Sequence, residues 1–173
     1  MPKKTEESDG EVNAAAFMAA AAQAAIETLP GKSALHANAA GVECTAAWAW
    51  SRSVDLDAAF GAVEPNAAVW DAGIGLHRRN RAFEEIVVWI EPHPASSTGT
   101  VGQMLNKLDW LKAKLSAVQF TGFRALTEGS QRRGSAFRWL ARTWRIRIRP
   151  GSRERRQLIK AGLGMPSRHL TVP

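Results

Sequence analysis

Two acids and a histidine stand at the ends of two short apolar segments of the sequence. Asp71 is the second residue of the segment 70–76, "WDAGIGL", and Glu91 is the last residue of the segment 85–91, "EIVVWIE". His93 follows two residues later. Buried segments rarely carry such side chains, whereas one or two carboxylates are typical protein ligands of Mg²⁺. These residue types and their spacing predict a metal site for Mg²⁺ or Mn²⁺, with Asp71 and Glu91 as ligands.

The apolar pattern of the two segments predicts how they pair as a β-hairpin. With Arg81 as the midpoint of a connection over residues 77–85, residues whose numbers sum to 162 lie opposite one another. One face is then wholly apolar, with the pairs Ala72–Ile90, Ile74–Val88 and Leu76–Ile86. A slip by one residue would divide that face, whereas a slip by two would preserve it. We therefore expect Asp71 and Glu91 to be cross-strand neighbours, with Cβ atoms roughly 4.5–5.5 Å apart.

Two directly opposed carboxylates destabilise a hairpin unless a positive charge lies between them. His93 would project to the same side as Glu91 because side chains alternate along a strand. Gly73 and Gly75 are expected to leave this face open beside the acids. The alternative interpretation of the same residues is a pair of solvated acids and a surface histidine where the sheet ends.

The surrounding sequence predicts the elements that would hold these residues in place. Residues 98–118 carry apolar side chains at a period near 3.6, which is typical of an amphipathic helix. A connection rich in Gly and Ser follows this helix. The expected order is helix, undecided segment, hairpin, helix, strand and helix, at residues 14–25, 34–60, 70–91, 98–118, 136–150 and 152–164. Residues 1–8 are expected to be a disordered tail, and residues 9–173 a single domain.

This arrangement resembles the PD-(D/E)xK nuclease superfamily over about residues 60–145. The matching positions are Asp71 near the start of one strand and Glu91 at the end of the next, followed by an amphipathic helix and a further strand. The resemblance implies an α/β (α+β), restriction-endonuclease-like fold with a mixed central sheet of about four strands flanked by helices. It also implies Mg²⁺- or Mn²⁺-dependent hydrolysis of phosphodiester bonds in DNA or RNA. Some members add a glutamate, for which Glu27 and Glu64 are candidates.

Two positions depart from the pattern of that family. His93 stands where the family usually has a lysine, and Pro92 confines its segment to a strand end or a sheet edge. A lysine supplied by the following helix would preserve the chemistry, and Lys107 is a better candidate than Lys112. Either His93 or Lys107 would orient or deprotonate the attacking water. If His93 has this role, activity should fall below about pH 6, where an ordinary imidazole becomes protonated.

The C-terminal third of the chain is strongly basic. Residues 121–173 hold thirteen Lys or Arg against two Asp or Glu, whereas residues 1–120 hold ten against fourteen. Because arginine binds phosphate oxygens in a bidentate manner, a nucleic-acid partner is expected on the basic part, residues 132–160. Trp139 and Trp144 are expected in the core rather than stacked on bases. The arginines that we assign to nucleic-acid binding are Arg142, Arg145, Arg147, Arg149, Arg153 and Arg156.

The composition excludes several classes of protein. Cys44 is the only cysteine, so the chain has neither an intramolecular disulfide nor a cysteine-rich zinc cluster, and a cytoplasmic location is expected. The Ala-rich run 14–25 is too short to span a bilayer and follows an acidic segment, so we expect no membrane partner. Three functions remain open. They are a metal-dependent nuclease, a non-catalytic nucleic-acid-binding protein with a degenerate nuclease site, and a protein-interaction module that uses the basic face.

Overall fold

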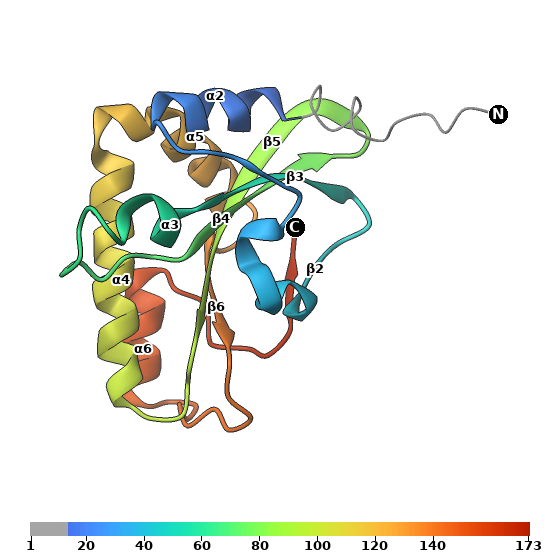
Figure 1. The fold of residues 1–173 in the computed structure, drawn as a ribbon. Coiled ribbons are helices and arrows are strands. Elements are labelled where there is room, and N and C mark those ends of the chain that lie inside the picture. The colour runs from blue at the N-terminus through green and yellow to red at the C-terminus, as the bar shows by residue number, and fades with distance from the viewer. Residues whose placement is uncertain (1–13) are drawn as a thin grey trace.

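A five-stranded mixed sheet lies at the centre of the computed structural model, which describes residues 14–173 (Figure 1). In spatial order its strands are β1 (Leu29–Pro30), β3 (Trp48–Asp55), β4 (Ala72–Arg78), β5 (Arg81–His93) and β6 (Phe137–Ala141). Neighbouring strands are antiparallel except β5 and β6, which run parallel. The expectation of a mixed sheet flanked by helices is confirmed. The sheet has one strand more than the four expected, because the two-residue β1 extends its edge.

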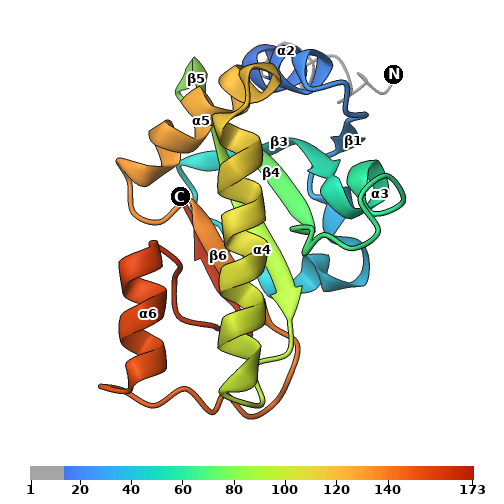
Figure 2. The ribbon, with the colours of Figure 1, turned by 90° about the vertical axis from the view of Figure 1, so that its left-hand side faces the viewer.

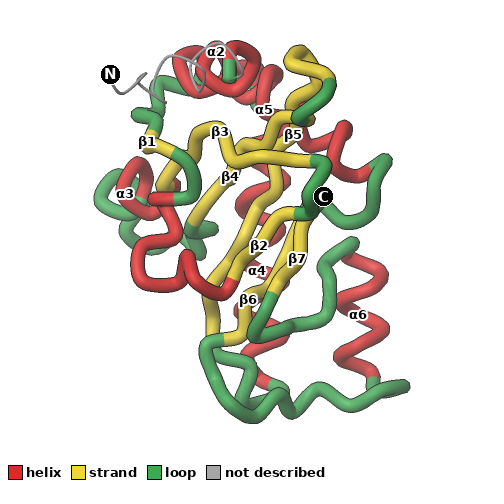
Figure 3. Tube along the Cα trace, turned by 90° about the vertical axis from the view of Figure 1, so that its right-hand side faces the viewer, coloured by secondary structure: helices red, strands yellow, loops and turns green. Residues whose placement is uncertain are grey.

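The sheet is covered on both faces by different kinds of element. One face carries helices α2 (Ala15–Gln23), α4 (Gly99–Ser116), α5 (Thr121–Gln131) and α6 (Arg153–Ala161) (Figure 2). The opposite face carries the 3₁₀ segment η1 (Ser33–Gly41) and a parallel pair made of β2 (Val42–Cys44) and β7 (Leu170–Val172) (Figure 3). The short elements α3 (Leu56–Phe60) and η2 (Val118–Phe120) complete the described chain. Each covered face holds its own cluster of buried apolar residues.

Strands β4 and β5 pair in the register that the apolar pattern predicts. Ala72 lies opposite Ile90, Ile74 opposite Val88 and Leu76 opposite Ile86, and all six side chains are buried on the face toward η1, β2 and β7. The connection is shorter than the loop expected over residues 77–85, because β5 already begins at Arg81. A shift of register between His77 and Arg78 absorbs the difference. The register was therefore predicted correctly, but the midpoint and the loop length were not, because Arg81 pairs with Arg78 and the turn lies at residues 79 and 80.

The prediction that Gly73 and Gly75 leave their face open is wrong. A Cβ atom at Gly73 would lie 2.5 Å from Cζ3 of Trp89, and one at Gly75 would lie 2.6 Å from Cδ2 of Phe17. Both distances are far below van der Waals contact. Glycine is present here because aromatic rings of the helix-side core lie directly against the backbone of β4. The acids therefore stand at the edge of a filled core.

The helix predicted over residues 98–118 is confirmed as α4, whose buried side chains are Val101, Met104, Leu108, Leu111 and Leu115. The Gly- and Ser-rich connection expected after it is largely helix α5. Phe123, Leu126 and Thr127 of this helix are buried against the sheet. Glycine and serine are weak helix formers, but burial of an amphipathic face overrides propensity.

The strand predicted over residues 136–150 is correct only up to Ala141, where β6 ends. Its parallel partner β5 ends at His93, and the following Pro94 has no N–H to continue the ladder. The chain then leaves the sheet, although the backbone N–H of Arg142 still donates to the carbonyl of His93 at 3.2 Å. Residues beyond Ala141 therefore form an irregular segment in place of the rest of the predicted strand.

The remaining predictions have mixed outcomes. The undecided segment 34–60 contains η1, β2, β3 and α3, and the basic helix predicted over residues 152–164 is α6. The tail expected over residues 1–8 lies outside the described residues. Between residues 14 and 173, no helix combines the length and apolar character that crossing a bilayer requires.

Candidate functional site

Asp71, Glu91 and Lys107 meet where the helix-covered face of the sheet ends. Asp71 directly precedes β4, Glu91 lies near the end of β5, and Lys107 reaches across from α4. Lys107 Nζ donates to Asp71 Oδ1 at 2.9 Å and also hydrogen-bonds Glu91 Oε1. The backbone N–H of Asp71 donates to Glu91 Oε2 at 2.8 Å. The expectation that the two acids are cross-strand neighbours is thus confirmed, and the positive charge beside both is Lys107.

Burial sets the electrostatics of this cluster. Glu91 is fully buried, whereas the Asp71 side chain is 36% exposed. Burial, together with the negative charge of Asp71, raises the pKa of Glu91 to about 8, although Lys107 acts in the opposite direction. Burial also acts to lower the pKa of Lys107, but its hydrogen bonds and charge interactions with both carboxylates outweigh this, and the net shift is upward. The cluster therefore holds a charged lysine beside a carboxyl group whose burial favours its protonated form.

His93 lies beside the three-residue cluster on the same side as Glu91. Its Nδ1 is 3.8 Å from Glu91 Oε1, which is too long for a hydrogen bond. Its Nε2 is 3.0 Å from Oε1 of Gln103, a residue of α4. A proton on Nε2, donated to this amide oxygen, would leave the lone pair of a neutral ring on Nδ1. The contact with Gln103 thus orients the His93 ring beside Glu91.

The other candidate residues lie apart from this cluster. Lys112 Nζ donates to the carbonyl of Ala161 at 2.7 Å, so it points toward α6. Glu64 pairs with Lys114 and accepts from Trp110 Nε1 at 2.8 Å. Glu27 lines a separate hollow beside α3. Of the two lysines considered, Lys107 is the one that meets the acids, and neither additional glutamate does.

A small pocket of about 80 Å³ adjoins Asp71 on the side toward η1. Its lining includes Asp71, Pro92, Asn38 and the pair formed by His36 and Asp55. His36 Nε2 lies 2.7 Å from Asp55 Oδ2. Asp71 therefore faces two environments, because its Oδ1 contacts Lys107 on the helix side while its side chain also borders this pocket. Solvent can reach Asp71, whereas Glu91 stays buried.

All six arginines assigned to nucleic-acid binding are exposed. None of them forms a salt bridge with a residue of the described chain. Their segment is held next to the end of β5, because the N–H of Arg147 donates to the carbonyl of Ala95 at 3.1 Å. Trp139 is fully buried, as expected, but the prediction for Trp144 is wrong because its residue is 83% exposed. The backbone contacts of Arg142 with His93 and of Arg147 with Ala95 thus place the start of this segment beside the end of β5.

The oxygen-rich donor set fits a hard divalent cation. Among residues 14–173 no group of three or more His, Cys, Asp and Glu side chains is placed to hold a metal ion. Mg²⁺, however, is commonly held by one or two carboxylates, with water and substrate phosphate oxygens in its other positions. Asp71 and Glu91 supply two such carboxylates, which converge on Lys107 Nζ. These two residues would hold the ion.

Sequence reasoning missed Gln103 and the pocket residues Asn38 and His36. Gln103 lies four residues before Lys107, so both fall on the same face of α4, and this spacing was the available signal. Asn38 and His36 belong to η1, whose position depends on contacts that are remote in sequence. His36 has φ +48°, which is uncommon for a residue other than glycine. No local sequence pattern predicts this backbone conformation.

Comparison with models of known protein families, with curated proteins and with solved structures found no match, so geometry and chemistry carry the interpretation of the site.

Proposed function

We propose that this protein is a metal-dependent nuclease that hydrolyses phosphodiester bonds in DNA or RNA. The observation that carries the proposal is the convergence of the Asp71 and Glu91 carboxylates on Lys107 Nζ at one end of the sheet. A pair of solvated surface acids would not include a fully buried carboxyl group that accepts a hydrogen bond from the backbone N–H of the other acid. A buried acid with a strongly shifted pKa beside a charged partner is typical of functional sites.

The order of the elements supports the same proposal. Three antiparallel strands, β3 to β5, are followed by α4, η2 and α5 and then by β6, which runs parallel to β5. One acid precedes the middle strand and the other ends the third. This is the arrangement for which the PD-(D/E)xK resemblance was named, and the restriction-endonuclease-like fold is part of the proposal. The lysine comes from α4 rather than from the strand.

Each residue of the cluster has a distinct task in the proposed reaction. When bound, the divalent ion would acidify a water molecule and neutralise charge that develops on the phosphate. Glu91 and Asp71 would hold it, with Glu91 in its ionised form. Lys107 would remain a fixed positive charge beside the reacting phosphate. His93, oriented by Gln103, presents an unprotonated nitrogen that can accept the proton of the attacking water.

The exposed arginines would hold the substrate. Guanidinium groups that have no carboxylate partner are free to bind phosphate oxygens in a bidentate manner. Their position beside the end of β5 would bring a nucleic-acid backbone to the acid cluster. Such contacts position the backbone without reading its sequence, so the proposal includes no base preference.

One observation favours a second candidate function, nucleic-acid binding without hydrolysis. Lys107 already contacts both carboxylates, and this internal ion pair compensates part of their charge without a metal. Together with Pro92 and His93, where the nuclease pattern has other residues, it is consistent with a site that has lost its activity. The exposed arginines would then be the functional part of the molecule.

Cleavage and binding, measured together, separate the two candidates. Purified protein is incubated with single- and double-stranded DNA and RNA, with Mg²⁺, with Mn²⁺ and with chelator. A nuclease cuts at least one substrate only with metal, and the double variant Asp71→Ala, Glu91→Ala loses cutting. Unchanged salt-sensitive binding by parent and variant, without cutting in any condition, would favour the second candidate. Absence of salt-dependent binding would contradict both.

A further inference from the structure

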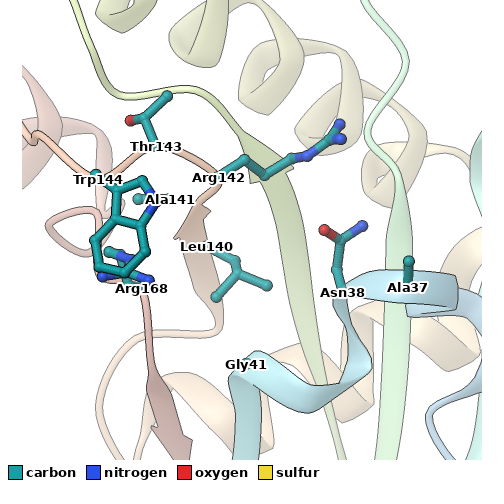
Figure 4. Close-up of a pocket in the computed structure, with 9 residues that line it drawn as sticks. All are labelled: Ala37, Asn38, Gly41, Leu140, Ala141, Arg142, Thr143, Trp144 and Arg168. Carbon is teal, nitrogen blue, oxygen red and sulfur yellow. The ribbon is translucent and has the colours of Figure 1, made fainter.

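A second pocket, of about 220 Å³, lies at the same end of the sheet on the face opposite α4 (Figure 4). Its walls come from η1, from the end of β6, from the irregular segment after β6, and from the residue two positions before β7. Pockets that bury a whole drug-sized ligand measure roughly 300–1,000 Å³, so this one suits a smaller group. The nine lining residues are Ala37, Asn38, Gly41, Leu140, Ala141, Arg142, Thr143, Trp144 and Arg168.

An exposed tryptophan forms one side of this pocket. Trp144 and Arg142 stand on opposite sides, and Leu140 lies on the floor between them (Figure 4). The guanidinium carbon of Arg168 lies 3.6 Å from the centroid of a Trp144 ring. This cation–π stack holds the indole in place from one side, while 83% of the residue stays exposed. A large, fixed and solvated aromatic ring is a platform on which a further planar group can stack.

The pocket is also rich in uncompensated positive charge. Within residues 14–173, neither Arg142 nor Arg168 has a carboxylate within 4 Å. Asn38 adds an amide on the side of Arg142 (Figure 4). The walls thus offer a stacking surface, anion-binding guanidinium groups and a side chain that both donates and accepts hydrogen bonds. A nucleotide, with its planar base and anionic phosphate, matches this combination.

The pocket adjoins the acid cluster. Asn38 lines both this pocket and the smaller one that borders Asp71. Leu140, on its floor, is the cross-strand neighbour of Pro92, which directly follows Glu91. A nucleic-acid strand that reaches the acids around the end of the sheet therefore passes this pocket.

We propose that the pocket binds one unpaired base of a single-stranded nucleic acid, which stacks on Trp144 while Arg142 and Arg168 bind the adjoining phosphates. This deepens the proposed nuclease function, on which it rests, by naming the substrate class. Bases within a duplex are already stacked on their neighbours and cannot cover the Trp144 ring without being extruded. Single strands, with their exposed base faces, are bound through aromatic platforms of this kind.

The test is binding of labelled oligonucleotides in the presence of chelator, so that no hydrolysis takes place. The probes are a short single strand, the same strand in a blunt duplex, and a single strand that contains 2-aminopurine. We expect Trp144→Ala to weaken single-strand binding by about five- to 150-fold, the range for loss of one stacked base, and duplex binding by less than about twofold. Trp144→Phe should retain most of the affinity, because it keeps an aromatic face. The parent should quench 2-aminopurine fluorescence, and Trp144→Ala should not.

Matched controls come from the other end of the β4–β5 hairpin. Phe83 is a 98% exposed aromatic residue, and Arg81 is an exposed arginine near it. Phe83→Ala and Arg81→Ala should leave single-strand affinity within about twofold of the parent. Arg168→Lys keeps the charge but removes the planar stack on the indole, and we expect an intermediate loss.

Several results would overturn the inference. They are equal losses for single strand and duplex in Trp144→Ala, a loss no larger than that in Phe83→Ala, and a parent with no salt-dependent affinity for any oligonucleotide. The last result would indicate an acidic protein as the partner of this surface. A different result would show that the nuclease proposal alone has failed. In that case no substrate is cut with metal, yet single strands still bind in a manner that depends on Trp144. Cutting of single strands that is unchanged in Trp144→Ala would overturn the pocket assignment alone.

Discussion

Lys107 of α4 hydrogen-bonds Glu91, a fully buried carboxyl group on the neighbouring strand β5. The same ammonium group donates to Asp71, so one cation holds two acids that would otherwise repel. Burial and, after it, the negative charge of Asp71 raise the pKa of Glu91 more than the positive charge of Lys107 lowers it. The contact between Lys107 and Glu91 therefore determines how substitutions and pH should alter stability, metal binding and activity.

Removing Lys107 should lower the free energy of unfolding, because Glu91 would then be buried without its cationic partner. We expect Lys107→Met to lower the free energy of unfolding by about 3–5 kcal/mol at pH 9, the range for a buried pair that loses one partner. At pH 6 the loss should be smaller, because Glu91 can take up a proton. Denaturant titration at both pH values measures the difference. The double variant Glu91→Gln, Lys107→Met should recover much of the loss, and Lys112→Met serves as the control on the same helix. Equal losses of unfolding free energy in Lys107→Met and Lys112→Met would contradict the role of Lys107 as the partner of Glu91.

The pKa of Glu91 predicts how stability depends on pH in the absence of metal. Its folded-state pKa, about 8, lies above the ordinary value of 4.5. The protonated form is therefore favoured by folding, and its contribution to stability is complete below about pH 4.5 and is lost as the pH rises to about 8. We expect the free energy of unfolding to fall by a few kcal/mol over this range. Glu91→Gln, which cannot ionise, should flatten that part of the curve. If the unfolding free energies of the parent and of Glu91→Gln change with pH in parallel, Glu91 is not the group with the raised pKa.

His93 and Gln103 should affect catalysis rather than binding. We expect His93→Ala to reduce metal-dependent cleavage by roughly 10²–10⁴-fold, the usual contribution of a general base. Gln103→Ala should give a smaller loss, because the imidazole remains but is no longer oriented by its hydrogen bond. Single-turnover cleavage and oligonucleotide affinity are measured on the same preparations. A fall in affinity that accounts for the whole loss of rate would assign both residues to substrate binding instead.

The basic segment should produce strongly salt-dependent binding. If about six phosphates are contacted, affinity should fall roughly 10³-fold between 50 and 200 mM salt. Each substitution to alanine within Arg145, Arg147 and Arg149 should reduce the slope of the logarithmic plot by about 1. Arg81→Ala, outside the segment, should leave the slope unchanged. Filter binding or fluorescence anisotropy at four salt concentrations measures these slopes, and a parent slope near zero would exclude a polyanion partner.

The register of the central hairpin could be predicted because strand side chains alternate strictly between two faces. A single residue of slip would have put the two halves of the apolar set that includes Ile74 and Val88 on opposite faces of the hairpin, so the apolar pattern allowed only one parity. The apolar stripe of the helix placed Lys107 and Lys112 at its opposite edges and did not by itself decide between them. For the hairpin register, a local period and one apolar face were sufficient.

Other parts of the fold depend on contacts that local patterns do not record. The strand predicted through residue 150 ends at Ala141 because its partner strand ends, and that partner is more than forty residues away in the sequence. Trp144 was assigned to the core from its apparent strand alternation, yet the chain has left the sheet by that point. Helix α5 was missed because Gly and Ser have low intrinsic helix propensity, although tertiary packing buries one of its faces.

The most direct test of the central claim is single-turnover cleavage of one single-stranded substrate by the parent and by Glu91→Gln. This substitution keeps the shape of the side chain and its buried position, but it removes the charge that would hold the ion. We predict that the parent cuts with Mg²⁺ or Mn²⁺ and not with chelator. The folded variant should bind the same substrate as tightly as the parent and leave it intact. Equal cutting by the two proteins, or cutting that persists in chelator, would contradict the assignment of Glu91 to a metal-dependent active site.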